Sequence, residues 1–397
     1  MNDRRHPERY LKRMRFFLEL IGDPHRGMKF IHITGTAGKG TVTNLVHEML
    51  YASGRNVGSF TSPFVTTYIE KIRVGNRFIP PDEFAEIVEY LKPYIDHADK
   101  SCRFGRPSYF EALLAIGFIY FRRRKCDIIV LEAGCGGRFD ATNVIEDPLI
   151  TAITNIDYDH TDIFGKNLKN IAFEKAGIIK KGSHFFTSEK RKNLLEIFKS
   201  ECRKTGANWT ILPKTDDYME TNFILASTIA KTLGVSERQI AKGAKTHRLP
   251  CRFEKMQDSP TVILDGAHNR IKMRSTAENL RKMRFKRSHL VIAISANKDK
   301  RAILREIIPF TDHAYFTRFQ VKERRCSHPA ELIKASRPFL KPKASIETYL
   351  DPNRALGSAL KKASSKDLVL VTGSFYLAGE LRRIWVSEDR ILRRRRL

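Results

Sequence analysis

The sequence predicts an α/β protein in which a P-loop-type parallel-sheet domain precedes a smaller Rossmann-like α/β domain. Three observations lead to this fold class. Short apolar runs alternate with helix-like segments along most of the 397 residues, as in parallel sheets covered by helices. A strand-like run, a glycine turn and a helix-like segment follow one another at residues 28–46. The alternation breaks around residues 249–252, which predicts two domains, residues 1–249 and 250–397.

The turn at residues 35–41, Gly-Thr-Ala-Gly-Lys-Gly-Thr, is typical of a phosphate-binding site. Its glycines let backbone N–H groups approach an anion, and the helix N-terminus adds the positive end of its dipole. Lys39 adds a full charge, and Thr41 would place a hydroxyl near phosphate-bound magnesium. The spacing is not the common GxxxxGK[ST] form, because Gly40 separates these two residues. The alternative is an ordinary turn with a surface lysine, but the flanking strand and helix favour a nucleotide site.

Composition limits the classes of function. No apolar run reaches the roughly 18 residues that a membrane span needs. Residues 1–20 interleave charged and apolar residues at helical spacing, which predicts a first helix and not a signal peptide. The six cysteines form no CxxC pair. We therefore expect a cytoplasmic protein with reduced thiols, and neither a disulfide framework nor a zinc site.

The net charge is strongly positive, because 72 Lys and Arg stand against 44 Asp and Glu, giving +28. Such a charge attracts polyanions, and nucleic acid is the obvious candidate. The basic residues are spread along the chain, however, and only residues 393–396 form a dense run. No nucleic-acid-binding motif accompanies them. The sequence therefore favours anionic small molecules, or a property shared by the host's proteins, as the reason for the charge.

The first domain is predicted to alternate strands with helices. Residues 61–79 contain Pro, Gly and Asn and are expected to form an irregular loop near the nucleotide. The apolar run at residues 127–131 is typical of a buried parallel strand. Strands are expected at residues 30–33, 57–60, 127–131, 149–156, 185–186 and 209–211. Helices are expected from residue 41 or 42 to 52, from residue 81, and at about residues 108–125, 168–177 and 222–233.

A second strand–helix series begins at residue 261. Its regular alternation predicts a parallel sheet. The first strand of this series runs directly into Asp-Gly-Ala-His-Asn at residues 265–269. Strands are expected at residues 262–264, 290–294, 314–317, 344–349 and 368–371.

Polar side chains follow the buried strands of the first domain. Ser62 follows one strand, Glu132 ends the next, and Asp157, Asp159 and His160 follow another. Because the carboxyl ends of parallel strands meet at one edge of a sheet, we expect these groups to lie beside the phosphate turn. Magnesium bound to ATP takes a few such oxygen ligands. Taken singly, the glutamate could cap a turn and the histidine could be structural, but their joint placement favours a metal site.

Nine segments follow one another along the chain: GTAGKGT, TSPF with YIEKIRV, SYFEA, VLEAGCGGRFDATN, ITNIDYDHTDIFG, IAFEKAGII, LPCRFE, ILDGAHN and VTGSFYLAGEL. In this order they resemble the folylpolyglutamate synthase and dihydrofolate synthase branch of the Mur ligase superfamily. The resemblance runs from about residue 10 to about residue 385. LEAGCGGRFDATN, with EKAGI about 40 residues later, is its most specific part.

The resemblance implies an ATP- and magnesium-dependent amide ligase. In the family, a substrate carboxylate attacks the γ-phosphate of ATP, and the amine of L-glutamate then attacks the resulting acyl phosphate. Residues 1–249 would be an ATPase domain that also holds magnesium and folate. Residues 250–397 would close on ATP and bind glutamate. The expected acceptor is a folate or dihydropteroate. The protein is expected to be a monomer without membrane or nucleic-acid partners.

The matched motifs also imply two magnesium sites. Ser62 and Glu132 would ligate one ion, and Glu132 and His160 the second. Lys175, in the EKAGI match, would be carbamylated and so become a ligand of the second ion. Carbamylation needs a neutral amine, so the pKa of this lysine should be lowered. The alternative is a helix-surface cation paired with Glu174. The residues expected to carry catalysis are Lys39 and the ligands of the second ion, Glu132, His160 and Lys175.

The remaining assignments concern the nucleotide and the acceptor. Asp265 and His268 have an alternative as helix-capping and turn residues. The resemblance implies that Gly35, Thr36, Gly38, Lys39, Gly40 and Thr41 hold the phosphates of ATP, that Asn222, Arg252, Asp265 and His268 lie at the nucleotide, and that Ser108, Tyr109, Phe110, Glu111, Phe139, Asp140 and Ala141 hold the pterin-bearing substrate.

Several positions depart from the family pattern, among them Ala37, Phe64, Cys135 and Cys251. None removes a proposed metal ligand or Lys39, but they leave the identity of the acceptor open. One alternative is therefore a ligase of the same superfamily that uses a non-folate carboxylate. Another is a polyanion-binding protein on an inactive ligase scaffold, which the presence of every proposed ligand disfavours.

Overall fold

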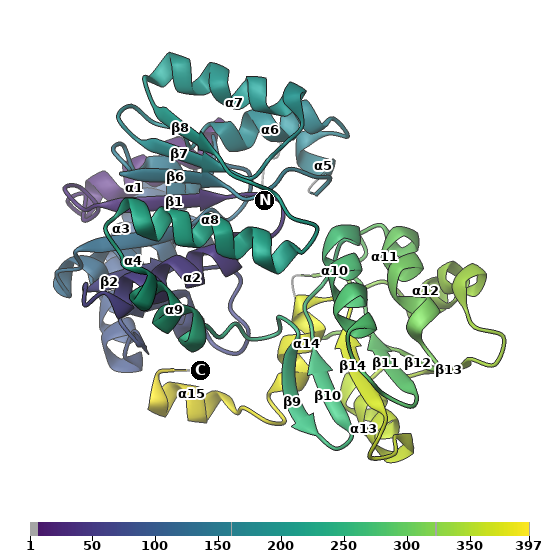
Figure 1. The fold of residues 1–397 in the computed structure, drawn as a ribbon. Helices are drawn as coiled ribbons and strands as arrows, with labels where there is room; N and C mark the ends of the chain where they lie inside the picture. Colours follow the sequence, from purple (N-terminus) through teal and green to yellow (C-terminus); the bar gives the residue numbers. More distant parts are fainter. Residues whose placement is uncertain (1–6, 160, 322–323, 397) are drawn as a thin grey trace. The chain divides into compact units, whose positions relative to one another are not determined.

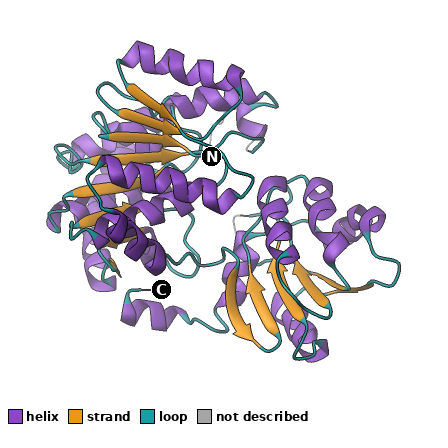
Figure 2. Cartoon of the chain, in the orientation of Figure 1, coloured by secondary structure: helices purple, strands orange, loops and turns teal. Residues whose placement is uncertain are grey.

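The computed structural model describes residues 7–159, 161–321 and 324–396. Within it the chain forms two compact units, each with its own sheet (Figures 1 and 2). Unit 1 contains the chain up to Phe64, Tyr68–Arg248 and Arg394–Arg396. Unit 2 contains Val65–Thr67 and Leu249–Arg393. The chain therefore passes between the units near residue 65 as well as near residue 249.

The sheet of unit 1 has eight strands in the order β4-β3-β2-β5-β1-β6-β7-β8. In this order, the six strands β2, β5, β1, β6, β7 and β8 are parallel to one another. Strands β3 and β4 form an antiparallel hairpin at one edge of the sheet. The prediction of an irregular loop over residues 61–79 is wrong for this hairpin, whose strands are too short to form an apolar pattern. The strands are β1 (Phe30–Thr34), β2 (Val57–Phe60), β3 (Ile72–Val74), β4 (Arg77–Phe78), β5 (Ile128–Glu132), β6 (Ile150–Ile153), β7 (His184–Thr187) and β8 (Asn208–Ile211).

Helices cover both faces of this sheet (Figure 1). One of them, α2, begins at Lys39, two residues earlier than predicted, because Gly38 adopts a left-handed conformation with φ 83° and forms the N-cap. The helices are α1 (Glu8–Leu20), α2 (Lys39–Ala52), α3 (Pro81–Ser101), α4 (Tyr109–Arg123), α5 (Thr161–Phe164), α6 (Leu168–Ala176), α7 (Lys192–Thr205), α8 (Tyr218–Thr232) and α9 (Glu237–Thr246), with short 3-10 helices η1 (Tyr68–Lys71) and η2 (Ala141–Val144).

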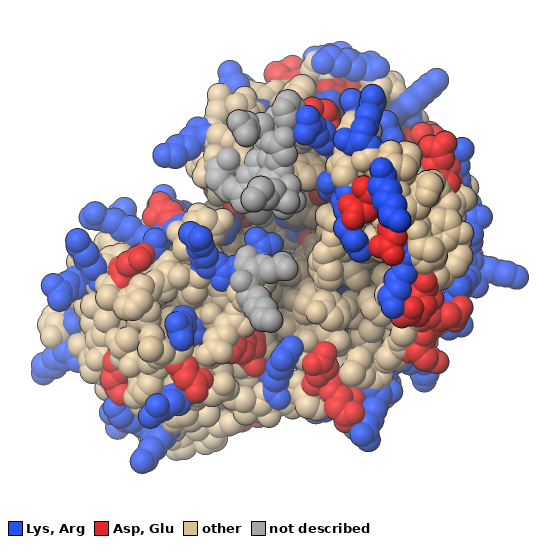
Figure 3. Space-filling view, turned by 180° about the vertical axis from the view of Figure 1, so that it is seen from behind, with Lys and Arg blue, Asp and Glu red and all other residues tan. Residues whose placement is uncertain are grey.

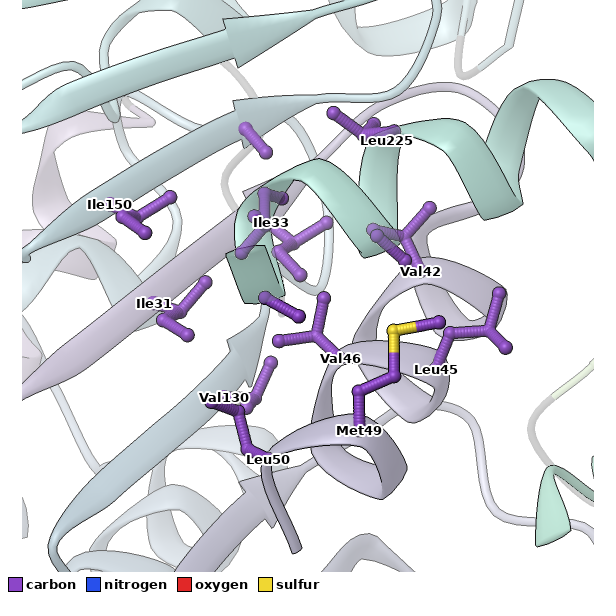
Figure 4. Close-up of a cluster of buried hydrophobic side chains, with 14 of the residues drawn as sticks. Ile31, Ile33, Val42, Leu45, Val46, Met49, Leu50, Val130, Ile150 and Leu225 are labelled. Atoms are coloured by element: carbon purple, nitrogen blue, oxygen red, sulfur yellow. The ribbon is translucent and has the colours of Figure 1, made fainter. Parts of the chain in front are cut away.

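A core cluster fixes α2 against the sheet (Figure 4). Ile31 and Ile33 from β1 meet Val42 and Val46 from α2, and all four are fully buried. Helices α8 and α9 pack against the other side of α2. Because α2 is enclosed on all sides, the turn that precedes it is held on a rigid support.

Unit 2 is a six-stranded sheet in the order β13-β12-β11-β14-β10-β9. Five strands are parallel, and the edge strand β9 is antiparallel to β10. The sequence did not indicate β9, because it is largely polar. The elements are β9 (Glu254–Asp258), β10 (Thr261–Leu264), α10 (Arg270–Arg281), β11 (Ser288–Ile292), α11 (Lys300–Ile307), η3 (Ile308–Phe310), β12 (His313–Phe316), α12 (Pro329–Ser336), η4 (Arg337–Phe339), β13 (Ser345–Thr348), α13 (Pro352–Lys362), β14 (Leu368–Thr372), α14 (Phe375–Arg382) and α15 (Glu388–Arg394).

The surface and the helices bear on the question of partners. Among the described residues, no helix is long and apolar enough to cross a bilayer. On the face drawn in Figure 3, Lys and Arg side chains are scattered and alternate with Asp and Glu. On that face, the high positive charge of the sequence is dispersed.

Candidate active site

The phosphate turn connects β1 to α2 at the carboxyl edge of the unit 1 sheet. Gly38 must be glycine here, because its φ is 83° and an added Cβ would lie 2.5 Å from Asn222 Oδ1. Gly35 has φ 153°, and an added Cβ would overlap the Thr154 hydroxyl. Thr41 lies in the first turn of α2 and is buried. The backbone is thus arranged as a phosphate cradle that side chains would fill.

Two lysines converge on this turn. Lys39 Nζ donates to Gly35 O at 2.8 Å, and Lys175 Nζ, from α6, donates to the same oxygen at 3.0 Å. Burial, and then the nearby Lys39 charge, lower the pKa of Lys175 to about 7. Lys39 therefore brings a positive charge to the turn, and Lys175 can be neutral near pH 7.

The turn is braced by the loop that follows β6. Thr36 Oγ1 donates to Asp157 O and accepts from Asp157 N, at 3.0 and 2.9 Å. Asn155 Oδ1 accepts from Ala37 N at 2.8 Å. Residue 37 therefore contributes a backbone contact even though its side chain is only a methyl group.

Glu132 ends β5 beside the turn. Its side chain is 3% exposed, and its Oε2 accepts from Ser62 N at 3.0 Å. A Cβ added to Gly40 would be 3.5 Å from the same oxygen. Ser62 and Glu132 are therefore adjacent to each other and to the phosphate turn, and they offer the hard oxygen donors that magnesium prefers.

The second proposed metal site can be followed only in part. His160 lies outside the described residues. Lys175, Asp159 and Cys135 line one pocket together with Gly35 and Lys39. Among the residues described, no three His, Cys, Asp or Glu side chains are grouped as a ready metal site.

Asn222 reaches the turn from α8. The residue is 2% exposed, its Oδ1 faces Gly38, and its Nδ2 has no hydrogen-bond partner in the described part of the chain. An unpaired buried amide costs stability. A ligand acceptor at the phosphate turn would remove that cost, which fits a nucleotide contact.

Asp140 has an internal role in the loop after Glu132. His32 Nε2, Thr142 Oγ1 and Asp140 Oδ1 form a chain with distances of 2.8 and 2.5 Å. Asp140 Oδ2 accepts from Cys135 N at 2.7 Å. Burial lowers the pKa of His32 to about 3, so its ring is neutral. Because the Thr142 hydroxyl donates to Asp140, it accepts from His32 Nε2. The predicted acceptor residues Asp140 and Ala141 are both buried, and Phe139 is partly exposed.

The segment at the start of α4 is divided between two roles. Glu111 Oε1 and Oε2 accept from Arg13 at 3.0 and 2.8 Å, and Glu111 also forms a capping box with Ser108. Tyr109 is 55% exposed and meets the ring of Tyr68 edge-on, with centroids 5.9 Å apart. Ser108 and Glu111 thus fix the helix start, and Tyr109 is the member of the set most available to a ligand.

Lys71, at the end of η1, was not singled out from the sequence, although it lies in the quoted YIEKIRV segment. Its side chain is 4% exposed. Its ammonium lies 5.6 Å from the ring centroid of Phe60 and 5.3 Å from that of Phe110. Burial lowers the pKa of Lys71 to about 8, opposed by the carboxylate of Glu132. No alternation or glycine pattern could have shown that this lysine points inward.

The other predicted nucleotide residues belong to unit 2. Asp265 follows β10, and its carboxylate accepts from Phe253 N at 2.8 Å and from Ala267 N at 2.7 Å. Arg252 lies 4.5 Å from the ring centroid of Phe375. His268 Nδ1 donates to a backbone carbonyl at 2.8 Å. Burial raises the pKa of Asp265. These residues order a tight loop at the carboxyl edge of the second sheet.

Cys251 precedes Arg252 where the resemblance leads one to expect glycine. The residue is fully buried and has φ 53°. This left-handed backbone is the one that glycine adopts without strain. The position therefore adopts a backbone conformation that suits glycine although it carries a side chain.

Comparisons with known proteins agree with this architecture. The model of the Mur ligase, glutamate ligase domain matches residues 251–375. The dihydrofolate synthase/folylpolyglutamate synthase of Bacillus subtilis (strain 168) is 31% identical over 414 residues, covering 94% of each chain. The structure of folylpolyglutamate synthase from Thermotoga maritima is 30% identical with a TM-score of 0.80, covering 95% of this chain and 93% of that one. The Mycobacterium tuberculosis folylpolyglutamate synthase complexed with ADP and AMPPCP is 25% identical with a TM-score of 0.87, covering 95% and 96%.

Proposed function

Since this chain belongs to the dihydrofolate synthase/folylpolyglutamate synthase family of ADP-forming ligases, we propose that it joins L-glutamate to the carboxylate of a folate or of dihydropteroate. The observation that carries this proposal is the convergence of Lys39 and Lys175 on a glycine turn beside Glu132. A triphosphate, a metal ion and a reacting carboxylate are the anions and cations that this arrangement suits.

The phosphate turn would bind ATP. The backbone N–H groups at the start of α2 and the ammonium of Lys39 would face the negative charge that builds up during phosphoryl transfer. Asn222 would satisfy its unpaired amide on the nucleotide. In the reaction, a carboxylate oxygen of the acceptor bonds to the γ-phosphorus of ATP. At the same time, the bond between this phosphorus and the oxygen that leaves with ADP breaks. The glutamate amine then attacks the acyl carbon, and phosphate leaves.

Magnesium would be held by Ser62 and Glu132 at one site and by Glu132, His160 and Lys175 at a second. When bound, the metal supplies charge neutralisation at the phosphates. The oxygen donors of Ser62 and Glu132 fit such an ion, because they are adjacent and lie next to the turn. The backbone positions of Ser62 and Glu132, at the ends of strands, would keep these oxygen donors in place.

Lys175 would act as its carbamate. Carbon dioxide reacts with a neutral amine, and a pKa lowered to about 7 makes that form abundant near neutral pH. The carbamate replaces a positive charge with a negative one beside Lys39. Carbon-13 NMR of protein equilibrated with labelled bicarbonate should show a carbamate resonance that disappears in Lys175→Arg. A spectrum without that resonance would contradict the assignment.

The acceptor would lie along the segment that includes Tyr109, Phe110 and Phe139, and unit 2 would bind glutamate and complete the nucleotide site with Arg252, Asp265 and His268. The exposed ring of Tyr109 supports the first part, because pterin and benzoyl rings stack on aromatic side chains. The match of residues 251–375 to a glutamate ligase domain supports the second.

The direct test is product analysis. Purified protein is incubated with ATP, magnesium, L-glutamate and a mixture of reduced folates, dihydropteroate and unrelated carboxylic acids. Mass spectrometry should show a pteroyl product that is heavier by one glutamyl residue, and ADP should form in equal amount. A glutamyl adduct of an unrelated acid alone would favour a non-folate acceptor. No ADP release with any acceptor would refute the ligase assignment.

A further inference from the structure

A buried lysine lies between the aromatic residues proposed for the acceptor and the carboxylate proposed for magnesium. Lys71 is 4% exposed, and its ammonium faces the rings of Phe60 and Phe110. The only charged group found to act on this ammonium within the described residues is the carboxylate of Glu132. Burial disfavours the charged form of Lys71, and the carboxylate of Glu132 offsets only part of this cost, which a ligand anion would reduce further.

The surroundings of Lys71 indicate where such an anion would come from. Phe110 lies against the loop that follows Glu132, because a Cβ on Gly134 would be 2.8 Å from its ring. Glu132 is the carboxylate that acts on the Lys71 charge, and it borders Gly40 of the phosphate turn. The ammonium is therefore held near the place where γ-phosphate and metal are proposed to meet.

The side of η1 that carries Lys71 is aromatic and partly open. Tyr68 and Lys71 are the first and last residues of η1, and in a 3-10 helix residues three apart lie on the same side. Tyr68 is 49% exposed and touches the rings of Phe64 and Tyr109, with centroids 4.9 and 5.9 Å away. An acceptor with an aromatic body could rest on these rings and extend its carboxylate inward.

We propose that Lys71 binds the reacting carboxylate of the acceptor substrate and holds it for attack on the γ-phosphate of ATP. This inference rests on the proposed ligase function and adds a residue to it. The ammonium offsets the repulsion between the incoming carboxylate, Glu132 and the phosphates. It keeps one carboxylate oxygen in place while the other forms the bond to phosphorus. Its three N–H donors suit this task, and the two rings fix its position without competing as anions.

The experiment compares wild type with Lys71→Met, Lys71→Gln and Lys71→Arg. Lys100→Met removes a lysine from the exposed face of α3 and is the matched control. Acceptor-dependent ADP release should fall by about 100-fold or more in Lys71→Met and Lys71→Gln, as when one transition-state donor is lost. Binding of ADP, measured by calorimetry, should stay within about twofold of wild type. Lys71→Arg should recover part of the activity, because it keeps the charge.

A ligand pair separates a direct contact from a merely structural role. Binding of the acceptor acid and of its carboxamide analogue is measured with ADP and without added magnesium. Wild type should bind the acid at least about tenfold more tightly than the amide, and Lys71→Gln should bind the two about equally. A role confined to packing would weaken both ligands alike and leave their ratio unchanged, which would overturn the inference.

The outcomes also separate this inference from the function on which it rests. If wild type forms no glutamyl product with any acceptor, the proposed function fails. If wild type is active and Lys71→Gln retains its turnover or its acid-to-amide ratio, the inference about Lys71 fails alone. Should Lys71→Met lose ADP binding through misfolding, Lys71→Gln and Lys71→Arg still give the acid-to-amide ratio.

Discussion

The residues proposed to bind ligands have different surroundings in the two units. In unit 1, Lys71 is buried with its ammonium against two aromatic rings, and Nδ2 of Asn222 is buried without a hydrogen-bond partner in the described chain. In unit 2, the two oxygens of Asp265 accept the backbone N–H groups of Phe253, before β9, and Ala267, after β10. Lys71 and Asn222 would gain polar partners from a ligand, whereas Asp265 already has partners within the protein. Substitutions in unit 1 should therefore alter binding, and those in unit 2 should alter binding and folding together.

The largest effect is expected for Lys39→Ala. Its ammonium donates to the carbonyl of Gly35, four residues earlier in the chain, so the fold loses little. Turnover should fall by about 1,000-fold, because a charge that faces the transferring phosphoryl group is removed. The free energy of unfolding should change by less than about 0.5 kcal/mol.

The measurement for Lys39 is ADP release alongside urea unfolding, with the exposed Lys29→Ala as control. Retained glutamate-dependent turnover in Lys39→Ala would contradict the phosphate role. A large loss of stability would contradict the view that Lys39 contributes to ligand binding and little to folding.

The next effect contrasts Asp265→Ala with Asn222→Ala. Removing Asp265 leaves two buried N–H groups without acceptors, which should cost about 1–3 kcal/mol of unfolding free energy. Removing the amide of Asn222 should cost less than about 0.5 kcal/mol, because its Nδ2 is already unpaired. The same variant should weaken nucleotide binding about tenfold. Calorimetric unfolding and ADP titration test both, and equal losses of stability in the two variants would erase the contrast between the units.

The smallest effect concerns pH. The pKa of His32 is about 3 in the folded protein and about 6.5 when unfolded. Between these values the unfolded chain binds a proton that the folded chain does not, so stability falls as pH falls. From pH 6 to pH 5 the loss assigned to His32 should be about 1 kcal/mol. Urea unfolding of wild type and His32→Gln, whose amide can still donate to Thr142, should show a shallower pH dependence in the variant. Parallel curves would refute the assignment.

Much of the architecture followed from local pattern. The buried strands around residues 30, 130 and 150 and the glycine turn all had clear apolar or glycine signals, and the family of the chain is confirmed by the comparisons. The hairpin β3–β4 and the edge strand β9 were missed, because short or polar edge strands lack an apolar run. The start of α2 was misplaced, since Gly40 is a poor helix former and only the conformation of Gly38 shows where the helix begins.

Part of the candidate site could be predicted from the sequence. Parallel-sheet geometry explains why Ser62 and Glu132, 70 residues apart, become neighbours. Side-chain direction is a different matter. That Lys71 points between two rings, or that Glu111 pairs with Arg13, depends on tertiary packing. A sequence states residue type and spacing, and neither gives the partner of a charged group in the folded chain.

The three residues Val65–Thr67 belong to unit 2 although their neighbours in sequence belong to unit 1. Val65 packs with the unit 2 core, its carbonyl lies where a Cβ on Gly379 would be 2.7 Å away, and Arg383 donates to Thr66 O at 3.1 Å. A gene fragment that starts at residue 249 would thus encode unit 2 without these three residues. Genetic dissection of this protein should graft that tripeptide onto the fragment, or keep the polypeptide whole.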